Sequence, residues 1–142
     1  MAHQIAVFAE NKPGRVERVS RVLGEAGVNI RAITIATADS FGVIKLLVDD
    51  PAKGRDALAA AGLSVSLREI VAIVMDDRPG GLHEAAQILA RAGVNIEDAY
   101  GFVISDRKRA VLVVEVDKVP EATGLLREHG VRTLSDAEIY TL

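Results

Sequence analysis

The fold is decided by residues 10–30, ENKPGRVERVSRVLGEAGVNI, because residues 76–96 repeat them as DDRPGGLHEAAQILARAGVNI. The Pro-Gly pair and the Val-Asn-Ile tripeptide both return at one offset. Pro13 and Pro79 give that offset as 66 positions (79 − 13 = 66). Similarity at a fixed spacing of about half the chain length indicates two copies of one structural unit.

The length of 142 residues fits two small domains, and we expect them to comprise residues 1–69 and residues 70–142. Domains of roughly 70 residues bury only a limited apolar core. We therefore expect the two copies to pack on each other or on a second chain.

An apolar face marks a helix in the middle of each repeat. Val16, Val19, Leu23 and Ala26 follow the i, i+3, i+7, i+10 spacing of one helix face, and equivalent residues follow 66 positions later. Gly27 then supplies the left-handed residue that ends many helices. The proline before each helix suits a helix start, because its φ angle is helical and it has no N–H group to leave unpaired.

The strands around these helices give each half the order β-α-β-β-α-β. The predicted strands span residues 4–9, 28–37, 41–49 and 63–67 in the first half and residues 71–75, 95–104, 110–117 and 137–141 in the second. Each half has a second predicted helix, at residues 51–61 or 119–129. This is the ferredoxin-like order, so the predicted fold class is α+β, with two tandem units whose antiparallel sheets carry both helices on one face.

The second copy contains an insertion. LVDD at residues 47–50 matches VEVD at residues 114–117, so the offset has grown to 67 after the second hairpin strand. We expect one extra residue in the turn around Ser105-Asp106-Arg107-Lys108, because turns tolerate insertions.

Both faces of the first sheet are predicted to be partly apolar. Ile33, Ile35, Val43 and Leu47 alternate along their strands with other apolar residues, where a solvated face would carry polar ones. We infer that the face opposite the helices is covered by the other half or by another chain.

The repeated loop and strand start have the groups that an α-amino acid needs. A Pro-Gly loop at a helix start offers free backbone N–H groups to a carboxylate, and Gly14, Gly80 and Gly81 let a ligand approach the backbone. An asparagine amide both donates and accepts hydrogen bonds, although the repeated asparagine is also explained by a turn role. In the second copy, Asp76 or Asp77 could balance an ammonium group.

The motifs NKPG…AGVNI and DRPG…AGVNI, each in a βαββαβ frame, resemble the ACT domain. The segment DSFGVIKLLVDDP at residues 39–51 resembles stand-alone tandem ACT proteins that are described as amino-acid-binding. The resemblance covers nearly the whole chain. It implies a regulatory module that holds a small molecule between two ACT units, between the loop that precedes the first helix and the start of the strand that follows it.

Carried onto this chain, the resemblance implies ligand-binding residues in both copies. They are Asn11, Lys12, Pro13, Gly14, Arg15, Val28, Asn29 and Ile30 in the first, and Asp77, Arg78, Pro79, Gly80, Gly81, Leu82, Val94, Asn95 and Ile96 in the second. The copies differ after the Pro-Gly loop, and the second hairpin carries Arg107-Lys108-Arg109. We therefore expect the two sites to bind unequally.

Catalysis has little support in the sequence, and we predict no catalytic residues, no metal site and no cofactor. His3, His83 and His129 lie in different elements, and the chain has no cysteine. A net charge of −3 and an aromatic content of 4% disfavour nucleic-acid binding. Without a signal peptide or a long apolar stretch, we expect a cytoplasmic protein that does not enter a membrane.

Two functions remain. The first is an amino-acid-binding regulatory protein, a homodimer that signals through changed association. The alternative is a regulatory subunit that docks on an amino-acid biosynthetic enzyme such as acetolactate synthase. A minor enzyme on a ferredoxin-like frame is a third possibility, disfavoured because no reactive constellation is present.

Overall fold

The structure is a computed structural model and describes residues 1–104, 106 and 108–141. The chain divides into two compact units. The first unit comprises His3–Arg68, and the second comprises Met1–Ala2 together with Glu69–Leu142. Ser105, Arg107 and Leu142 lie outside the described residues, and so do the predictions made for Ser105 and Arg107.

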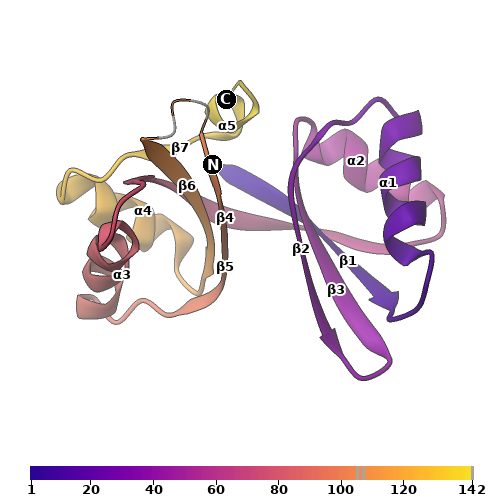
Figure 1. The fold of residues 1–142 in the computed structure, drawn as a ribbon, viewed down its shortest axis with the longest axis horizontal. Helices are drawn as coiled ribbons and strands as arrows, with labels where there is room; N and C mark the ends of the chain where they lie inside the picture. Colours follow the sequence, from indigo (N-terminus) through magenta and orange to yellow (C-terminus); the bar gives the residue numbers. More distant parts are fainter. Residues whose placement is uncertain (105, 107, 142) are drawn as a thin grey trace. The chain divides into compact units, whose positions relative to one another are not determined.

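The first unit is a sheet with two helices on one face (Figure 1). Its strands are ordered β2-β3-β1-β4, and the β1–β3 and β2–β3 pairs are antiparallel. Its elements are β1 (Ala2–Glu10), α1 (Arg15–Glu25), β2 (Ile30–Ala38), β3 (Phe41–Val48), α2 (Pro51–Ala60) and the beginning of β4 (Ser64–Asp76).

The second unit repeats this plan around the rest of β4. Strand β4 pairs antiparallel with both β6 and β7, and β5 pairs antiparallel with β6. The remaining elements are α3 (Gly81–Arg91), β5 (Ile96–Val103), β6 (Arg109–Val116), α4 (Val119–Glu128), β7 (Thr133–Leu134) and α5 (Asp136–Tyr140). Helices α3 and α4 cover one face of the sheet (Figure 1), so the predicted α+β class and antiparallel sheets are confirmed. No described helix has both the length and the apolar character to span a bilayer.

Equivalent residues fill the two cores. Leu23 of α1 and Leu89 of α3 are fully buried at an offset of 66, and Leu58 of α2 and Leu126 of α4 are fully buried at an offset of 68. The repeated apolar spacing in the sequence therefore corresponds to repeated packing. The predicted helix stops are confirmed as well, because the glycines after α1 and α3 have φ angles of 73° and 71°.

The structure corrects the prediction of a single inserted residue. Ile30 pairs with Val48, and Ile96 pairs with Val116. The offset is 66 at the first partner (96 − 30) and 68 at the second (116 − 48), so the second hairpin carries two extra residues. Aligning LVDD with VEVD gives an offset that is one position too small. The two segments can be aligned in this wrong way because both are aliphatic and end in acids.

The prediction of separate strands at residues 63–67 and 71–75 was wrong, since β4 runs without a break from Ser64 to Asp76. The residues between them, Arg68, Glu69 and Ile70, include no glycine or proline that would interrupt a strand.

The final predicted strand, residues 137–141, was also wrong. It is the short helix α5, and the last strand is β7. Ser135 caps α5: its side chain accepts from the Glu138 N–H group, and the Glu138 carboxylate accepts from the Ser135 N–H group at 2.8 Å. This capping box was legible in the sequence as Ser-x-x-Glu.

The apolar residues of β2 lie on a different face from the one predicted. Ile33 pairs with Leu46 and Ile35 with Ile44, and both partners belong to the core that faces the helices. The register shifts between Ile30 and the second residue after it. A shift of one residue transfers the following side chains to the other face of a sheet.

Candidate functional site

The loop between β1 and α1 is tied to the β2–β3 turn. The Asn11 backbone N–H donates to the Ser40 carbonyl at 2.7 Å, and the Asn11 amide donates to the Asp39 carbonyl at 3.1 Å. Asp39 adopts a φ of 53°, a left-handed conformation that asparagine and aspartate tolerate. One end of the predicted site is therefore fixed by hydrogen bonds.

The Pro-Gly loop ends in a helix cap made by glycine. Gly14 precedes α1 with a φ of 90°, Gly80 precedes α3 with a φ of 85°, and neither helix start has a side-chain cap. Pro13 and Pro79 lie one residue before these caps, so each Pro-Gly pair marks a helix start as predicted, with the proline outside the helix. The left-handed cap excludes proline, whose φ is near −65°. Each helix start presents backbone N–H groups at the positive end of the helix dipole.

Charged side chains surround the start of α1. The Glu10 carboxylate lies 3.0 Å from the Lys12 ammonium and 3.8 Å from the Arg15 guanidinium. The hydrogen bond from Lys12, with the charges of Lys12 and Arg15, holds the pKa of Glu10 below its ordinary value. Glu10 is therefore an anion at neutral pH, next to two cations.

A cavity of about 120 Å³ lies beside this cluster. It brings together the predicted residues Asn11, Lys12 and Arg15, and it adds residues from β2 and β3 that the sequence did not single out as ligand contacts. Its lining comprises Ala9, Glu10, Asn11, Lys12, Arg15, Val16, Ile35, Thr37, Gly42 and Ile44. The hairpin contributes because the Asn11 hydrogen bonds hold the loop against its turn.

The start of β2 does not line this cavity. Val28 is a core residue, and the Asn29 backbone N–H donates to the Asp49 carboxylate at 2.9 Å. The Asp49 N–H in turn donates to the Asn29 carbonyl at 3.1 Å. These residues follow the C-terminus of α1, roughly 16 Å of helix from its start. The two halves of the predicted site therefore do not meet within one unit.

The second unit repeats this arrangement at the start of β5. Val94 is buried, and the Asn95 backbone N–H donates to the Asp117 carboxylate at 3.3 Å. Sequence reasoning missed these two aspartates as partners of the repeated asparagines. The available signal was an acid directly after the second hairpin strand in both copies.

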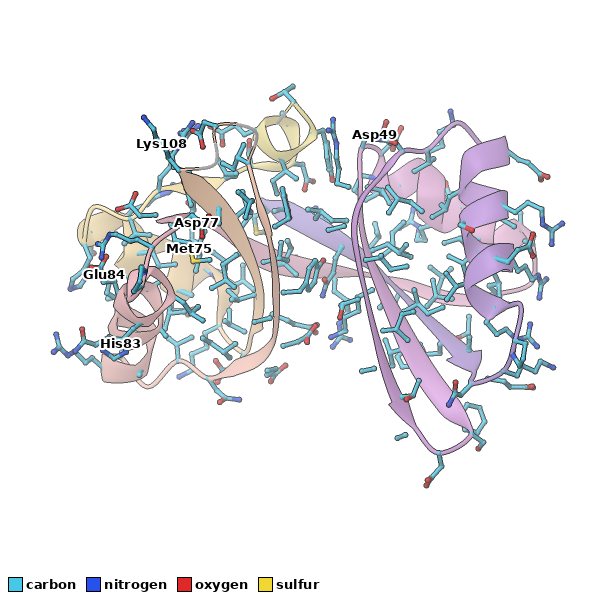
Figure 2. The ribbon with its side chains drawn as sticks, in the orientation of Figure 1. Asp49, Met75, Asp77, His83, Glu84 and Lys108 are labelled. Atoms are coloured by element: carbon cyan, nitrogen blue, oxygen red, sulfur yellow. The ribbon has the colours of Figure 1, made fainter. Side chains whose placement is uncertain are left out.

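The loop before α3 is held by ion pairs. The Arg78 guanidinium lies 2.6 Å from Glu84 and 3.5 Å from Asp76, and the hydrogen bond that Arg78 donates to Glu84 raises the Arg78 pKa. The Asp77 N–H donates to the Lys108 carbonyl at 2.9 Å. Met75 and Glu84, both labelled in Figure 2, line one cavity beside this loop together with Asp76.

Packing explains why residue 81 is a glycine. A Cβ atom added there would lie 2.2 Å from the Asp76 carbonyl oxygen. The group that closely approaches the backbone at Gly81 is therefore the Asp76 carbonyl. Its neighbour Leu82 is exposed, and so is His83. Among the described residues, no group of three or more His, Asp or Glu side chains is arranged to hold a metal ion.

Comparison with known proteins places this geometry in a family. The whole chain, residues 1–142, matches the family model described as an ACT domain pair. A curated relative, described as a probable acetolactate synthase small subunit from Archaeoglobus fulgidus, is 25% identical over 95% of this chain and 92% of its own.

Solved structures agree with the fold. The crystal structure of a Bacteroides thetaiotaomicron protein is 31% identical, covers 99% of this chain and 96% of its own, and superposes with a TM-score of 0.93. The regulatory subunit of aspartate kinase from Thermus thermophilus is 20% identical, with a TM-score of 0.65 over 89% of this chain and 91% of its own. The match to the family model along the full chain, on a doubled βαββαβ fold, shows that this protein belongs to the ACT domain pair family.

Proposed function

We propose that this protein binds an amino acid at the start of α1 and acts as a regulatory protein through that binding. The observation that carries the proposal is the arrangement of Glu10, Asn11, Lys12 and Arg15 around the cavity of about 120 Å³. The cations and the α1 N–H groups suit a carboxylate, and the anionic Glu10 suits an ammonium group.

A second ACT unit would complete the site. Strand β2 stands at an edge of the sheet, and Ile33 and Ile35 are 44% and 48% exposed on its helix-facing side. Val16 on α1 is 41% exposed. An edge strand with exposed apolar residues is suited to pairing with another chain. We propose a homodimer in which the partner adds Val28, Asn29 and Ile30, and a second site formed by the residues at 77–82 and 94–96.

Thermal unfolding against the twenty amino acids tests the binding. A ligand at a hundred times its dissociation constant adds about 2.7 kcal/mol of stability, which raises the unfolding midpoint measurably. Asn11→Ala and Asn29→Ala should both remove the shift. Arg21→Gln is the matched control, because Arg21 is exposed on α1 and pairs with Glu17. If no amino acid raises the midpoint, the proposal is wrong.

Sedimentation tests the pairing. Ile33→Glu places a charge on the β2 edge and should convert a dimer to a monomer, whereas Arg55→Gln, at a partly exposed position of α2, should leave the dimer intact. A protein that sediments as a monomer at all concentrations would exclude a site built between two copies.

The Archaeoglobus fulgidus relative favours a second candidate function, a regulatory subunit of a biosynthetic enzyme. We would add this protein to a purified acetolactate synthase catalytic subunit from the organism that encodes this protein. The addition should then change the enzyme's rate or its response to an amino acid. Unchanged kinetics and separate elution in gel filtration would exclude that enzyme as the partner.

A further inference from the structure

The first unit holds a second cavity, of about 420 Å³. It lies where the end of β1, the start of α1 and the turn between α2 and β4 come together. Its lining comprises Phe8, Ala9, Glu10, Arg15, Arg18, Phe41, Gly62, Leu63 and Ser64. Arg18 and the turn residues 62–64 take no part in the proposed amino-acid site.

The second unit has the same cavity at equivalent positions, with a volume of about 260 Å³. Its residues correspond at the offsets of 66 and 68 that the strand and helix registers give. Its lining comprises Val74, Met75, Asp76, Gly81, Glu84, Ala85, Gly130, Val131 and Arg132. The duplicated fold therefore contains a duplicated cavity.

The two cavities differ in charge. Arg15 of the first corresponds to Gly81 of the second, and Arg18 corresponds to Glu84. Glu84 is neutralised by Arg78 at 2.6 Å. The second cavity also has a guanidinium group in its lining, that of Arg132, but Arg132 lies 3.6 Å from Glu138, so this cavity has no excess of positive charge.

The first cavity has guanidinium charge in excess. Arg15 Nε is buried and has no hydrogen-bond partner among the described residues, and the Glu10 carboxylate lies 3.8 Å from Arg15 but is held more closely by Lys12 at 3.0 Å. Arg18 is half-buried and donates from Nη2 to the Ala61 carbonyl at 2.5 Å. A carbonyl is neutral, so the Arg18 charge is not cancelled there.

The opposite walls of the first cavity are apolar. Phe8 is 52% exposed and Phe41 is 65% exposed, and both line the cavity with Leu63. A ligand suited to this site has an anionic head for the guanidinium groups and an apolar body for the aromatic rings. In this lining the one carboxylate, Glu10, is outnumbered by the guanidinium groups of Arg15 and Arg18, and this net positive charge disfavours a ligand ammonium group.

We propose that the first-unit cavity binds a small carboxylate that carries an apolar substituent and no ammonium group, and that the equivalent cavity of the second unit does not. Ala9, Glu10 and Arg15 line both this cavity and that of the proposed amino-acid site, and the new site is distinguished by Arg18, the two phenylalanine rings and the turn residues 62–64. It needs only residues of the first unit, so its existence does not depend on the proposed function.

Three ligands of the same shape test the need for a negative charge and the exclusion of an ammonium group separately. 4-Methylpentanoate carries the anion, 4-methylpentanamide lacks the charge, and leucine adds an ammonium group. In a nuclear magnetic resonance titration of the full chain, 4-methylpentanoate should shift the amide signals of Gly62, Leu63 and Ser64 saturably. The signals of Gly130 and Val131, at the equivalent turn, should stay in place. The amide and leucine should bind about tenfold more weakly or worse, since a charge-assisted contact is lost or an ammonium group is left unpaired.

Variants test the guanidinium role. Arg18→Gln should raise the dissociation constant for 4-methylpentanoate about tenfold or more, whereas Arg21→Gln, on the exposed side of the same helix, should leave it unchanged. Because Arg18→Gln also removes the bond to Ala61, Ser64→Glu serves as a second variant: it leaves Arg18 in place, adds an anion to the cavity wall and should weaken binding similarly.

Three results would overturn the proposal. They are equal binding of the uncharged amide, wild-type affinity in both Arg18→Gln and Ser64→Glu, and equal shifts at the second-unit turn. Shifts confined to Asn11, Thr37 and Gly42 would place the carboxylate in the amino-acid site instead, and would also overturn it.

Discussion

At the scale of single residues, the repeated glycines have different physical reasons. Gly14 and Gly80 adopt φ angles near 90°, which are costly for a residue with a Cβ atom. Gly81 has no such angle, but the space of its missing Cβ is taken by a backbone carbonyl. The letters of the Pro-Gly-Gly stretch therefore report two separate constraints, and the structure tells them apart.

Gly81→Ala should destabilise the protein by about 1–3 kcal/mol, because a Cβ atom would lie 2.2 Å from the Asp76 carbonyl oxygen and the backbone must shift. Gly124→Ala is the matched control: Gly124 lies inside α4 with nothing within 4 Å of an added Cβ. Alanine there should stabilise by about 0.5–1 kcal/mol. Urea denaturation measures both, and equal effects would contradict the steric explanation.

A single residue, Tyr100, is expected to make the stability of the protein depend on pH. Burial, with the negative charges of Asp98 and Glu115, raises the pKa of Tyr100 above its ordinary value. Because the folded-state pKa is raised, its contribution to stability is fully present below the ordinary tyrosine pKa of about 10 and is lost as pH rises above that value.

The chain has two tyrosines, so Tyr140→Phe leaves Tyr100 as the single phenol. Its absorbance titration in the folded protein should give a midpoint above about 10. Tyr100→Phe should reduce the loss of unfolding free energy on the alkaline side of that pH. An ordinary midpoint for Tyr100 would show that the phenol is not desolvated.

At the scale of the elements, the two copies of the second helix differ in their caps. Asp50 caps α2 by accepting from the Lys53 N–H, whereas Lys118 precedes α4 without a side-chain cap. The backbone is nearly the same at both positions, with φ −140° and ψ 87° at Asp50 and φ −138° and ψ 74° at Lys118. The second copy therefore has the geometry for a cap but not the residue.

Lys118→Asp should stabilise the protein by about 1 kcal/mol, since an aspartate in this geometry can accept a hydrogen bond from the first helical turn and favours the positive end of the helix dipole. Lys118→Ala separates the cap from the loss of a lysine and should change little. Asp50→Ala should remove about the same free energy from the first copy. Chemical denaturation of the three variants measures these changes; no gain in Lys118→Asp over Lys118→Ala would refute the equivalence of the caps.

At the scale of the whole molecule, the two units share one strand. Strand β4 begins in the first unit and ends in the second. The expected boundary between residues 69 and 70 falls inside that strand. Units of about 70 residues are marginally stable alone, so a continuous strand through both favours unfolding as one.

Leu23→Ala and Leu89→Ala should each destabilise the protein by about 2–5 kcal/mol, because these leucines are fully buried at equivalent places in the two cores. We expect a single calorimetric transition in the wild type and in both variants. Two separated transitions, with only one moved by each substitution, would show instead that the units unfold independently despite the shared strand.

The sequence by itself determined the elements that follow from local chemistry and from repetition. The doubled Pro-Gly and Ala-Gly-Val letters gave the tandem βαββαβ plan, and the glycines after α1 and α3 marked the helix ends because the left-handed region favours that residue. The loop residues Asn11, Lys12 and Arg15 were also predicted for the site, since they adjoin a helix start that every copy of this fold must contain.

Only the tertiary structure decided what depends on register and on distant neighbours. The face of Ile33 and Ile35 was set by a shift in strand pairing, and the length of the insertion was set by the pairing of Ile96 with Val116. The cavities required Arg15, Arg18 and the turn after α2, segments separated by more than forty positions. Local propensity carries no information about contacts between distant segments, because these contacts form only when helices and strands pack. Packing also fixes which charges are left without a partner.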